Sequence, residues 1–249
     1  MSPDKVTLPY GRTHIEVRIP EQNLVGVYSP RDAAPAPDVR AEILRALESP
    51  IGSPPLREQL RGRQNAVLIA DDNTRLTPTD IVIPILLDEC NAAGIPDAAI
   101  RVIIALGTHR PMTGDEIRAK FGAETLGRVR VVNHAYQDPS ALVDLGTTGS
   151  GGRIRINRAV VEADFKMGIG SIVPHHIPGY AGGAKIIQPG VSGEETTAHT
   201  HLLSVRAPRS YLGLLENPVR AELDAIARKV GMHTILNTVL DRRGRFVQA

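Results

Sequence analysis

Short apolar runs that end abruptly in polar residues are the feature of this 249-residue sequence that most restricts its fold. Residues 66–70 (AVLIA) and 100–106 (IRVIIAL) read as buried strands, and each leads through a polar loop into a helical pattern. Residues 129–133 and 165–172 repeat this arrangement. Buried strands that alternate with amphipathic helices are typical of a mostly parallel sheet. We therefore predict an α/β fold, a Rossmann-like sheet with helices on both of its faces.

The two ends of the sequence add further elements to this sheet-and-helix pattern. Residues 14–19 alternate between polar and apolar, and together with residues 6–10 across Gly11 they predict an N-terminal β-hairpin. Near the other end, residues 219–230 place apolar side chains on one face of a predicted helix, and residues 234–240 predict a strand. We find no repeat of fixed period.

Composition excludes several classes of protein. The formal charge is +2, with 29 basic and 27 acidic residues spread along the chain, so there is no basic stripe of the kind that binds nucleic acid. Cys90 is the single cysteine, which excludes an internal disulfide framework and a cysteine-rich metal site. Neither a signal core nor an apolar run of membrane-spanning length is present. We expect a cytoplasmic protein without membrane or nucleic-acid partners.

Polar clusters follow three of the predicted strands. They are residues 72–75 (DNTR), 107–110 (GTHR) and 174–176 (PHH). In parallel α/β sheets, ligands bind in the crevice beyond the carboxyl ends of the strands. The sequence therefore predicts that these clusters converge on one site at one edge of the sheet.

Each cluster also has a purely structural explanation. Asp72 and Arg75 could belong to a capped, solvated loop, or Arg75 could bind a substrate carboxylate while Asp72 orients a neighbouring group. His109 could be a loop histidine held by backbone groups, or a general acid and base, since imidazole titrates closest to neutral pH. The loops alone do not decide between these alternatives.

Residues 173–190 (VPHHIPGYAGGAKIIQPG) combine two histidines, a glycine-rich turn and one lysine. His175 and His176 would point in opposite directions in an extended chain, so we expect only one of them to face a site. Lys185 could be a surface lysine, but the small and apolar residues around it favour an amine that is paired, depressed in pKa and nucleophilic, or covalently modified. The segment is not a Walker A loop, because alanine precedes the lysine and no Ser or Thr follows it.

A second histidine pair, His199 and His201, lies in the segment EETTAHTHLL. Residues two apart do not share a face of a helix, so only one of these imidazoles is a candidate ligand if the segment is helical. A single imidazole can bind nickel, zinc, copper or iron.

Together these segments resemble the lactate racemase family, the 2-hydroxyacid racemases and epimerases that depend on a nickel-pincer nucleotide. The resemblance is carried in chain order by DDNTR (71–75), GTHR (107–110), PHHIPGYAGGAKIIQPG (174–190), TTAHTH (196–201) and ENPVR (216–220). It implies that residues 1–249 correspond to the N-terminal cofactor-binding and catalytic α/β domain. On the same resemblance, we expect the C-terminal closing domain of the family to be absent from this chain.

The resemblance also implies a cofactor, pyridinium-3-thioamide-5-thiocarboxylic acid mononucleotide with nickel. Lys185 is similar to the lysine that holds this nucleotide through a thioamide bond, and the small Gly182 and Gly183 would leave room for it. His201 is similar to the imidazole that completes the nickel coordination. Enzymes of cofactor maturation are therefore expected partners.

For the reaction, the resemblance implies that His109 and His175 are acid/base histidines on opposite sides of the substrate carbon, with Asp72 and Arg75 as substrate-binding partners. The expected activity is racemisation or epimerisation of lactate or a related 2-hydroxy acid by reversible hydride transfer to the cofactor. Two alternatives stay open: a non-catalytic or incomplete cofactor-binding module, and an unrelated lysine-dependent α/β enzyme. We assign structural or supporting roles to His176 and His199.

Overall fold

The computed structural model describes residues 5–11, 13–28 and 31–249, and the chain divides into two compact units, Met1–Ala33 and Ala34–Ala249. In the first unit, β1 (Lys5–Tyr10) pairs antiparallel with β2 (Thr13–Arg18), and one 3-10 turn, η1 (Glu21–Asn23), follows. Whether residues 1–249 act as one domain stays a prediction.

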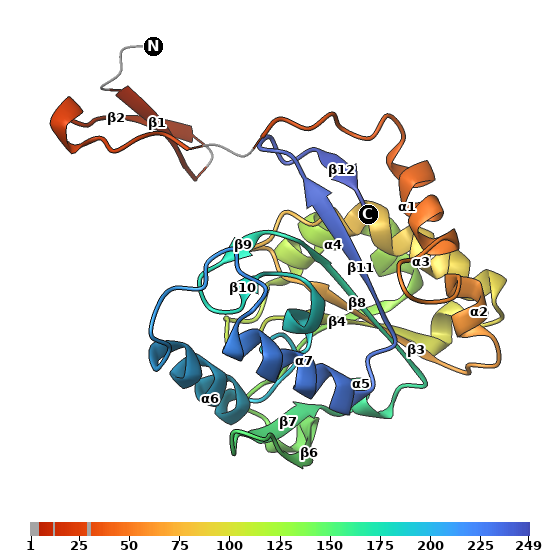
Figure 1. Cartoon of the computed structure of the whole chain (residues 1–249). Helices are drawn as coiled ribbons and strands as arrows, with labels where there is room; N and C mark the ends of the chain where they lie inside the picture. The colour runs from red at the N-terminus through yellow and green to blue at the C-terminus, as the bar shows by residue number, and fades with distance from the viewer. Residues whose placement is uncertain (1–4, 12, 29–30) are drawn as a thin grey trace. The chain divides into compact units, whose positions relative to one another are not determined.

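The second unit is built on a six-stranded sheet with the strand order β12-β11-β8-β3-β4-β5 (Figure 1). All neighbouring strands from β11 to β5 run parallel, and β12 is antiparallel to β11. The mostly parallel sheet predicted from the sequence is therefore confirmed.

The strands of the sheet are β3 (Ala66–Asp71), β4 (Ile100–Ala105), β5 (Arg130–Asn133), β8 (Phe165–Ser171), β11 (Thr234–Leu240) and β12 (Phe246–Gln248). Two small antiparallel pairs accompany it, β6 (Leu142–Thr147) with β7 (Arg153–Asn157), and β9 (Pro174–His175) with β10 (Gly179–Tyr180).

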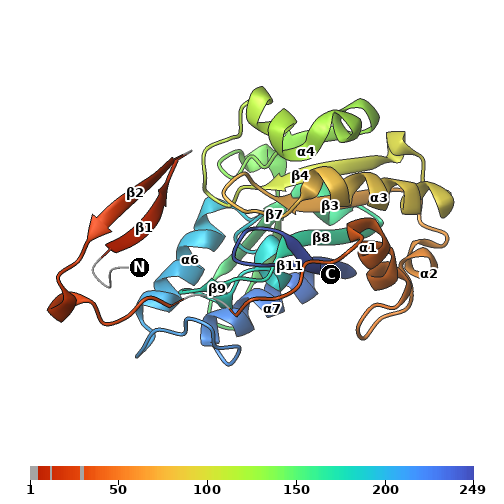
Figure 2. The same ribbon diagram turned by 90° about the horizontal axis from the view of Figure 1, so that it is seen from above.

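Helices cover both faces of the sheet, as Figures 1 and 2 show. One face packs against α1 to α4, and the other packs against α5, α7 and the 3-10 helix η4. The α-helices are α1 (Val39–Glu48), α2 (Leu56–Leu60), α3 (Thr79–Ala92), α4 (Gly114–Arg128), α5 (Arg158–Glu162), α6 (Glu194–Val205) and α7 (Pro218–Val230). The remaining 3-10 helices are η2 (Asp97–Ala99), η3 (Pro139–Ala141) and η4 (Gly183–Ile186).

The central strand β3 shows why the apolar runs are continuous. Leu68 and Ala70 point into the core beneath α1 to α4, whereas Val67 and Ile69 point into the core beneath α7. A strand that is buried on both faces has no position left for a polar side chain along its length. Polarity therefore begins only where the strand ends, at Asp71 and Asp72.

Within the described residues 5–11, 13–28 and 31–249, we find no helix whose length and apolar character would let it cross a membrane.

A buried ion pair fixes the loop that follows β3. Nζ of Lys120, on α4, lies 3.4 Å from Oδ1 of Asp71 and donates to the carbonyl oxygens of Arg75 and Thr77 at 2.7 and 2.8 Å. The hydroxyl of Thr77 donates to Oδ2 of Asp71 at 2.5 Å. Burial raises the pKa of Asp71, and the positive charge of Lys120 acts in the opposite direction. The carboxylate therefore depends on Lys120 for its charge.

We expect Lys120→Met to lower the free energy of unfolding by about 3–5 kcal/mol, because it leaves a buried carboxylate without its cation. Urea denaturation followed by circular dichroism measures this change. Lys229→Met is the control: Lys229 is exposed on α7, and a surface substitution of this kind changes stability by less than about 0.5 kcal/mol. A loss in Lys120→Met no larger than in this control would contradict the role of the ion pair.

Candidate functional site

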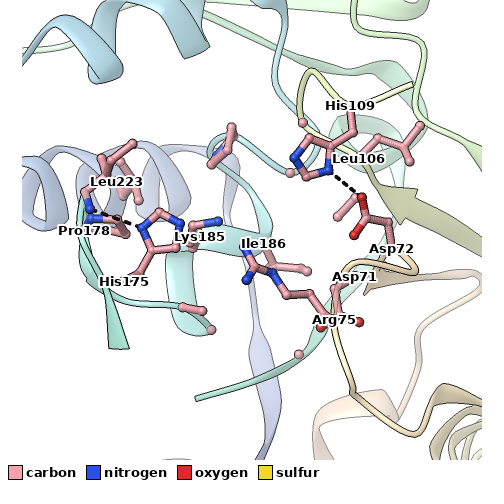
Figure 3. A pocket seen from close by; sticks show the side chains of 18 of the residues that line it. Asp71, Asp72, Arg75, Leu106, His109, His175, Pro178, Lys185, Ile186 and Leu223 are labelled. Carbon is pink, nitrogen blue, oxygen red and sulfur yellow. Dashed lines mark hydrogen bonds and ion pairs between the residues drawn. The ribbon is translucent and has the colours of Figure 1, made fainter. Parts of the chain in front are cut away.

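A cavity of about 350 Å³ lies at the carboxyl edge of the sheet. It is formed by the loops after β3, β4 and β8 together with η4, α6 and α7, and its volume is in the range of small-molecule sites. Of the residues predicted from the sequence, those that line it are Asp72, Arg75, His109, His175, Gly182, Lys185 and His201. Gly183 is adjacent in η4 but is not among the lining residues. Figure 3 shows His175 and His109 apart from each other, with Lys185 and the side chain of Arg75 between them.

Asp72 and His109 form a hydrogen-bonded pair that joins two loops (Figure 3). Oδ2 of Asp72 lies 2.6 Å from Nδ1 of His109, and its Oδ1 accepts from the amide and hydroxyl of Thr74 at 3.0 and 2.5 Å. Burial acts to raise the pKa of Asp72, but the hydrogen bonds from His109 and Thr74 outweigh it and leave the pKa lowered. Asp72 is therefore an anion whose Oδ2 accepts a hydrogen bond from the Nδ1–H of His109. This leaves Nε2 of His109 with a free lone pair, ready to accept a proton.

His175 presents the opposite protonation pattern. Its Nδ1 accepts the backbone N–H of Ile177 at 3.1 Å, so the neutral ring carries its proton on Nε2. Burial, followed by the positive charge of Lys185, lowers the pKa of His175 to about 4. In their neutral forms the two rings differ: the Nε2–H of His175 is a hydrogen-bond donor, whereas Nε2 of His109 is an acceptor.

The expectation that only one of His175 and His176 faces the site was wrong. Both line the cavity, and their rings stack with centroids 4.8 Å apart and planes 10° from parallel. The expectation assumed an extended chain, but β9 ends at His175 and the chain turns at once. Alternation of side chains across a strand therefore does not extend to His176.

Lys185 is a half-buried residue of η4, not a surface lysine. Burial lowers the pKa of its amine to about 8, with a further contribution from the positive charge of Arg75 that Asp72 opposes. Among the described residues, no hydrogen bond or ion pair engages its Nζ. A fraction of the amine is therefore neutral near pH 7, which is the form that acts as a nucleophile.

The glycine at position 182 is required by the packing of the protein itself. Gly182 has a φ of +74°, and a Cβ there would lie 2.7 Å from Oδ1 of Asn237 and 3.2 Å from the carbonyl oxygen of Ser171. The same Oδ1 of Asn237 accepts the backbone N–H of Gly183 at 3.3 Å. Room for a nucleotide is thus not the sole reason for glycine here, and the cofactor-binding roles of Gly182 and Gly183 stay predictions.

His199 and His201 lie on α6 and point to different surroundings, as their helical spacing predicts. His201 lines the cavity, and its Nδ1 lies 2.8 Å from the carbonyl oxygen of Thr197. With Nδ1–H donating to that carbonyl, Nε2 keeps a free lone pair, the usual arrangement of a metal-binding histidine. His199 instead places Nε2 2.7 Å from Oγ of Ser150. Within the described part of the chain, no group of three or more His, Cys, Asp or Glu residues could hold a metal ion unaided.

Residues 10–213 match the family described as the lactate racemase N-terminal domain. The chain belongs to this family. It is 32% identical over 248 residues to the lactate racemase of Thermoanaerobacterium thermosaccharolyticum, covering 98% of this chain and 58% of that protein. It is also 32% identical over 246 residues to the lactate racemase of Lactiplantibacillus plantarum, covering 97% of this chain and 58% of the relative.

Solved structures of relatives share the fold. The apoprotein of the Thermoanaerobacterium thermosaccharolyticum lactate racemase aligns with a TM-score of 0.85 at 31% identity, over 98% of this chain and 58% of that one. A crystal structure of a Thermotoga maritima protein aligns with a TM-score of 0.71 at 25% identity, over 87% of this chain and 55% of that one. This chain therefore spans a little over half the length of these relatives. Membership of the lactate racemase N-terminal domain family contradicts the alternative of an unrelated lysine-dependent enzyme.

Sequence reasoning missed several residues that support this lactate racemase-like site. Lys120 holds the loop of Asp72 and Arg75 by its carbonyl groups, and Asn237 supports the glycine turn. Neither lies in a segment with a recognisable motif. The segment 216–220 (ENPVR) contributes to the resemblance to the family, but its sequence alone indicates no role for its residues.

We expect His175 to stay neutral until the pH falls to about 4, the lowered pKa given by burial and the charge of Lys185. The unfolded chain would protonate this histidine near its ordinary value of 6.5, so His175 makes folding less favourable as the pH falls from about 6.5 to 4. An NMR titration of the His175 ring measures the midpoint. Lys185→Met should raise the midpoint, while Lys229→Met should leave it unchanged. A midpoint near 6.5 for the His175 ring in the wild type would show that burial and the nearby positive charges do not lower its pKa.

Proposed function

We propose that this chain forms the cofactor-binding and catalytic portion of a racemase or epimerase acting on lactate or a related 2-hydroxy acid. The observation that carries the proposal is the placement of an unpartnered Lys185 amine in one cavity with His109 and His175, whose Nε2 atoms differ in protonation. The proposal includes the Rossmann-like class of the sheet, a cytoplasmic location and cofactor-maturation enzymes as partners.

The residues of the cavity fit a nickel-pincer nucleotide. Lys185 offers an amine with a pKa of about 8 for a thioamide bond, and the carbonyl of Thr197 leaves Nε2 of His201 free to bind nickel. The positive charge of Arg75, which lines the cavity, suits a group that carries a phosphate. When bound, this cofactor would accept the Cα hydride of the substrate and return it, with a 2-keto acid in between.

The chain's own residues would bind the substrate and handle its hydroxyl proton. Arg75 lines the cavity with a planar fork of donors, suited to a substrate carboxylate. The hydroxyl proton would pass to Nε2 of His109, and the Asp72 carboxylate would stabilise the imidazolium that forms, through its bond to Nδ1. Asp72 thus orients the histidine and favours its protonated form.

His175 would handle the proton for the other enantiomer, but it starts from the other tautomer. Its Nε2–H can donate a hydrogen bond to the substrate oxygen. For Nε2 to accept a proton, the ring proton would have to move to Nδ1, and the contact between Nδ1 and the Ile177 N–H would have to break. The two directions of proton transfer are therefore not equivalent in this conformation, and reaction through His175 requires the turn at Ile177 to shift.

The proposal is tested by producing the chain together with the cofactor-maturation enzymes and measuring intact mass and nickel. We expect the peptide with Lys185 to gain the mass of a group that contains two sulfur atoms. We also expect about one nickel per chain. Activity is then measured by chiral chromatography as conversion of one enantiomer of the 2-hydroxy acid into the other, with and without the remaining portion of the Thermoanaerobacterium thermosaccharolyticum relative. A loaded protein that never interconverts the enantiomers would be a non-catalytic module, and an unmodified Lys185 would contradict the proposal.

We expect His201→Ala to reduce the nickel content of the loaded protein roughly tenfold or more, since even supporting contacts to metal ligands contribute this much to affinity. His199→Ala is the matched control on the same helix, because His199 contacts Ser150 and does not line the cavity. Nickel analysis after gel filtration measures both variants. Equal nickel in the two would show that His201 is not the ligand.

A further inference from the structure

The turn between His175 and Lys185 is held by two side chains of α7. Asn217 and Arg220 lie at the start of this helix, within the segment 216–220 (ENPVR). Between them they donate to four backbone carbonyl oxygens of the turn, those of Ile177, Pro178, Tyr180 and Gly182. We call residues 177–182 the lysine turn.

The individual contacts are well defined. Nδ2 of Asn217 donates to the Ile177 carbonyl at 2.8 Å, while its Oδ1 caps α7 by accepting the amide of Val219, also at 2.8 Å. Arg220 donates from Nε to the carbonyl of Pro178 at 3.3 Å and uses its two terminal nitrogens for the carbonyls of Tyr180 and Gly182. One asparagine therefore ties the start of α7 to the lysine turn, and one guanidinium supplies the rest of the donors.

Burial makes these contacts energetically important. Asn217 is 6% exposed, and the side chain of Arg220 is 12% exposed. Among the described residues, Arg220 has one acidic group within ion-pair distance, Asp224 at 3.9 Å, whose side chain is 41% exposed. Buried carbonyl groups need donors, and the planar guanidinium satisfies several at fixed angles. Removing it would leave carbonyls of the lysine turn without donors in a place that water reaches poorly.

The geometry points to a positioning role: we propose that Asn217 and Arg220 hold the lysine turn so that the amine of Lys185 is presented to the cavity. The assignment of Lys185 as the point of cofactor attachment comes from the proposed function, on which this inference rests. The contacts connect α7 directly to the turn whose two ends lead to His175 and Lys185. Neither Asn217 nor Arg220 lines the cavity, so both would act through Lys185.

The charges around Lys185 agree with this role. Burial lowers its pKa most, followed by the positive charge of Arg75 on the loop after β3. Asp72 and Asp71 act in the opposite direction, and Arg220 on α7 lowers the pKa further. His175, on β9, also interacts with Lys185. Loosening the lysine turn would expose the amine to water, and loss of Arg220 would remove a cation; both changes raise the pKa.

The experiment labels the unloaded chain with acetic anhydride across a range of pH and reads each lysine by peptide mass. In the wild type, the midpoint of Lys185 labelling is expected near pH 8. In Arg220→Gln it should move up toward the ordinary value of lysine, and amide hydrogen exchange in the lysine turn should become at least several-fold faster. Arg220→Lys keeps the charge without the fork, so it should speed exchange with a smaller shift of the midpoint. Arg228→Gln, at an exposed position of the same helix, is the control and should change neither quantity.

Lys120 and Lys166, whose amines donate to backbone carbonyls and lie in buried surroundings, report on the overall fold through their own labelling. If labelling of Lys120 and Lys166 also increases in Arg220→Gln, the variant has lost its overall fold. Asn217→Ser is then the variant that tests the proposal, because serine can still cap α7 but cannot also donate to the Ile177 carbonyl. Wild-type exchange in the lysine turn and a wild-type Lys185 midpoint in a folded variant would overturn the proposal. A wild-type chain that never acquires the cofactor would refute the proposed function and leave this labelling result standing.

Discussion

Lys185→Ala should abolish covalent attachment of the nickel-pincer nucleotide, taking the loaded fraction to background. The thioamide bond needs a primary amine inside the cavity, and Lys185 is the one lysine among the residues that line it. Lys185→Arg should do no better, because a guanidinium keeps the charge but stays protonated and cannot replace that amine. Intact mass of protein made with the maturation enzymes measures the loaded fraction directly.

Loss of cofactor attachment in Lys185→Ala should not result from misfolding of the variant. The Lys185 ammonium has no hydrogen bond or ion pair among the described residues, and its surroundings already lower its pKa to about 8. Removing a partly buried cation that lacks a partner should leave the free energy of unfolding unchanged or higher. Lys229→Ala, on the exposed side of α7, is the control for loading. Cofactor retained in Lys185→Ala or Lys185→Arg would refute the assignment.

The parts of the fold that the sequence predicts are those governed by local pattern. The strand at 66–70 and the helix at 219–230 have clear apolar periodicities, and the structure has them as β3 (Ala66–Asp71) and α7 (Pro218–Val230). The stacking of His175 on His176 could not be predicted, because it depends on a strand of two residues that turns at once. Short elements like this one carry no periodicity.

In the candidate site, too, some residues follow from sequence patterns and others depend on tertiary packing. Ligands bind beyond the carboxyl ends of parallel strands, and this rule predicts that Asp72, His109 and His175 lie at one site. The structure places all three in the lining of one cavity, on three separate loops. The supporting contacts of Lys120 and Arg220 lie outside any such rule, since each joins segments about 40 residues apart whose approach depends on tertiary packing. The tautomer of His175 is equally invisible in the sequence, because the Ile177 amide that donates to its Nδ1 is placed there by the turn after β9.

Alanine variants of His109 and His175 should each reduce net racemisation by roughly 10²–10⁴-fold, the usual contribution of a positioned acid or base. Inversion needs proton transfer on both sides of the substrate carbon, so neither histidine can replace the other. Single-turnover formation of the keto acid should separate them, because each variant should keep this half-reaction for one enantiomer and lose it for the other. Chiral analysis after a single turnover, in protein joined to the remaining portion of a relative, measures both effects.

The different tautomers of the two histidines add a sharper expectation to this comparison. Nε2 of His109 is ready to accept a proton, whereas Nε2 of His175 accepts one only after its contact with Ile177 breaks. In the wild type, the half-reaction that depends on His175 should therefore be the slower one, and Asp72→Asn should slow only the half-reaction that depends on His109. His176→Ala is the neighbouring control: it removes the stacked ring but no assigned proton acceptor. Full racemisation by His109→Ala, or equal loss with both enantiomers in each variant, would show that the acid/base roles lie on other residues.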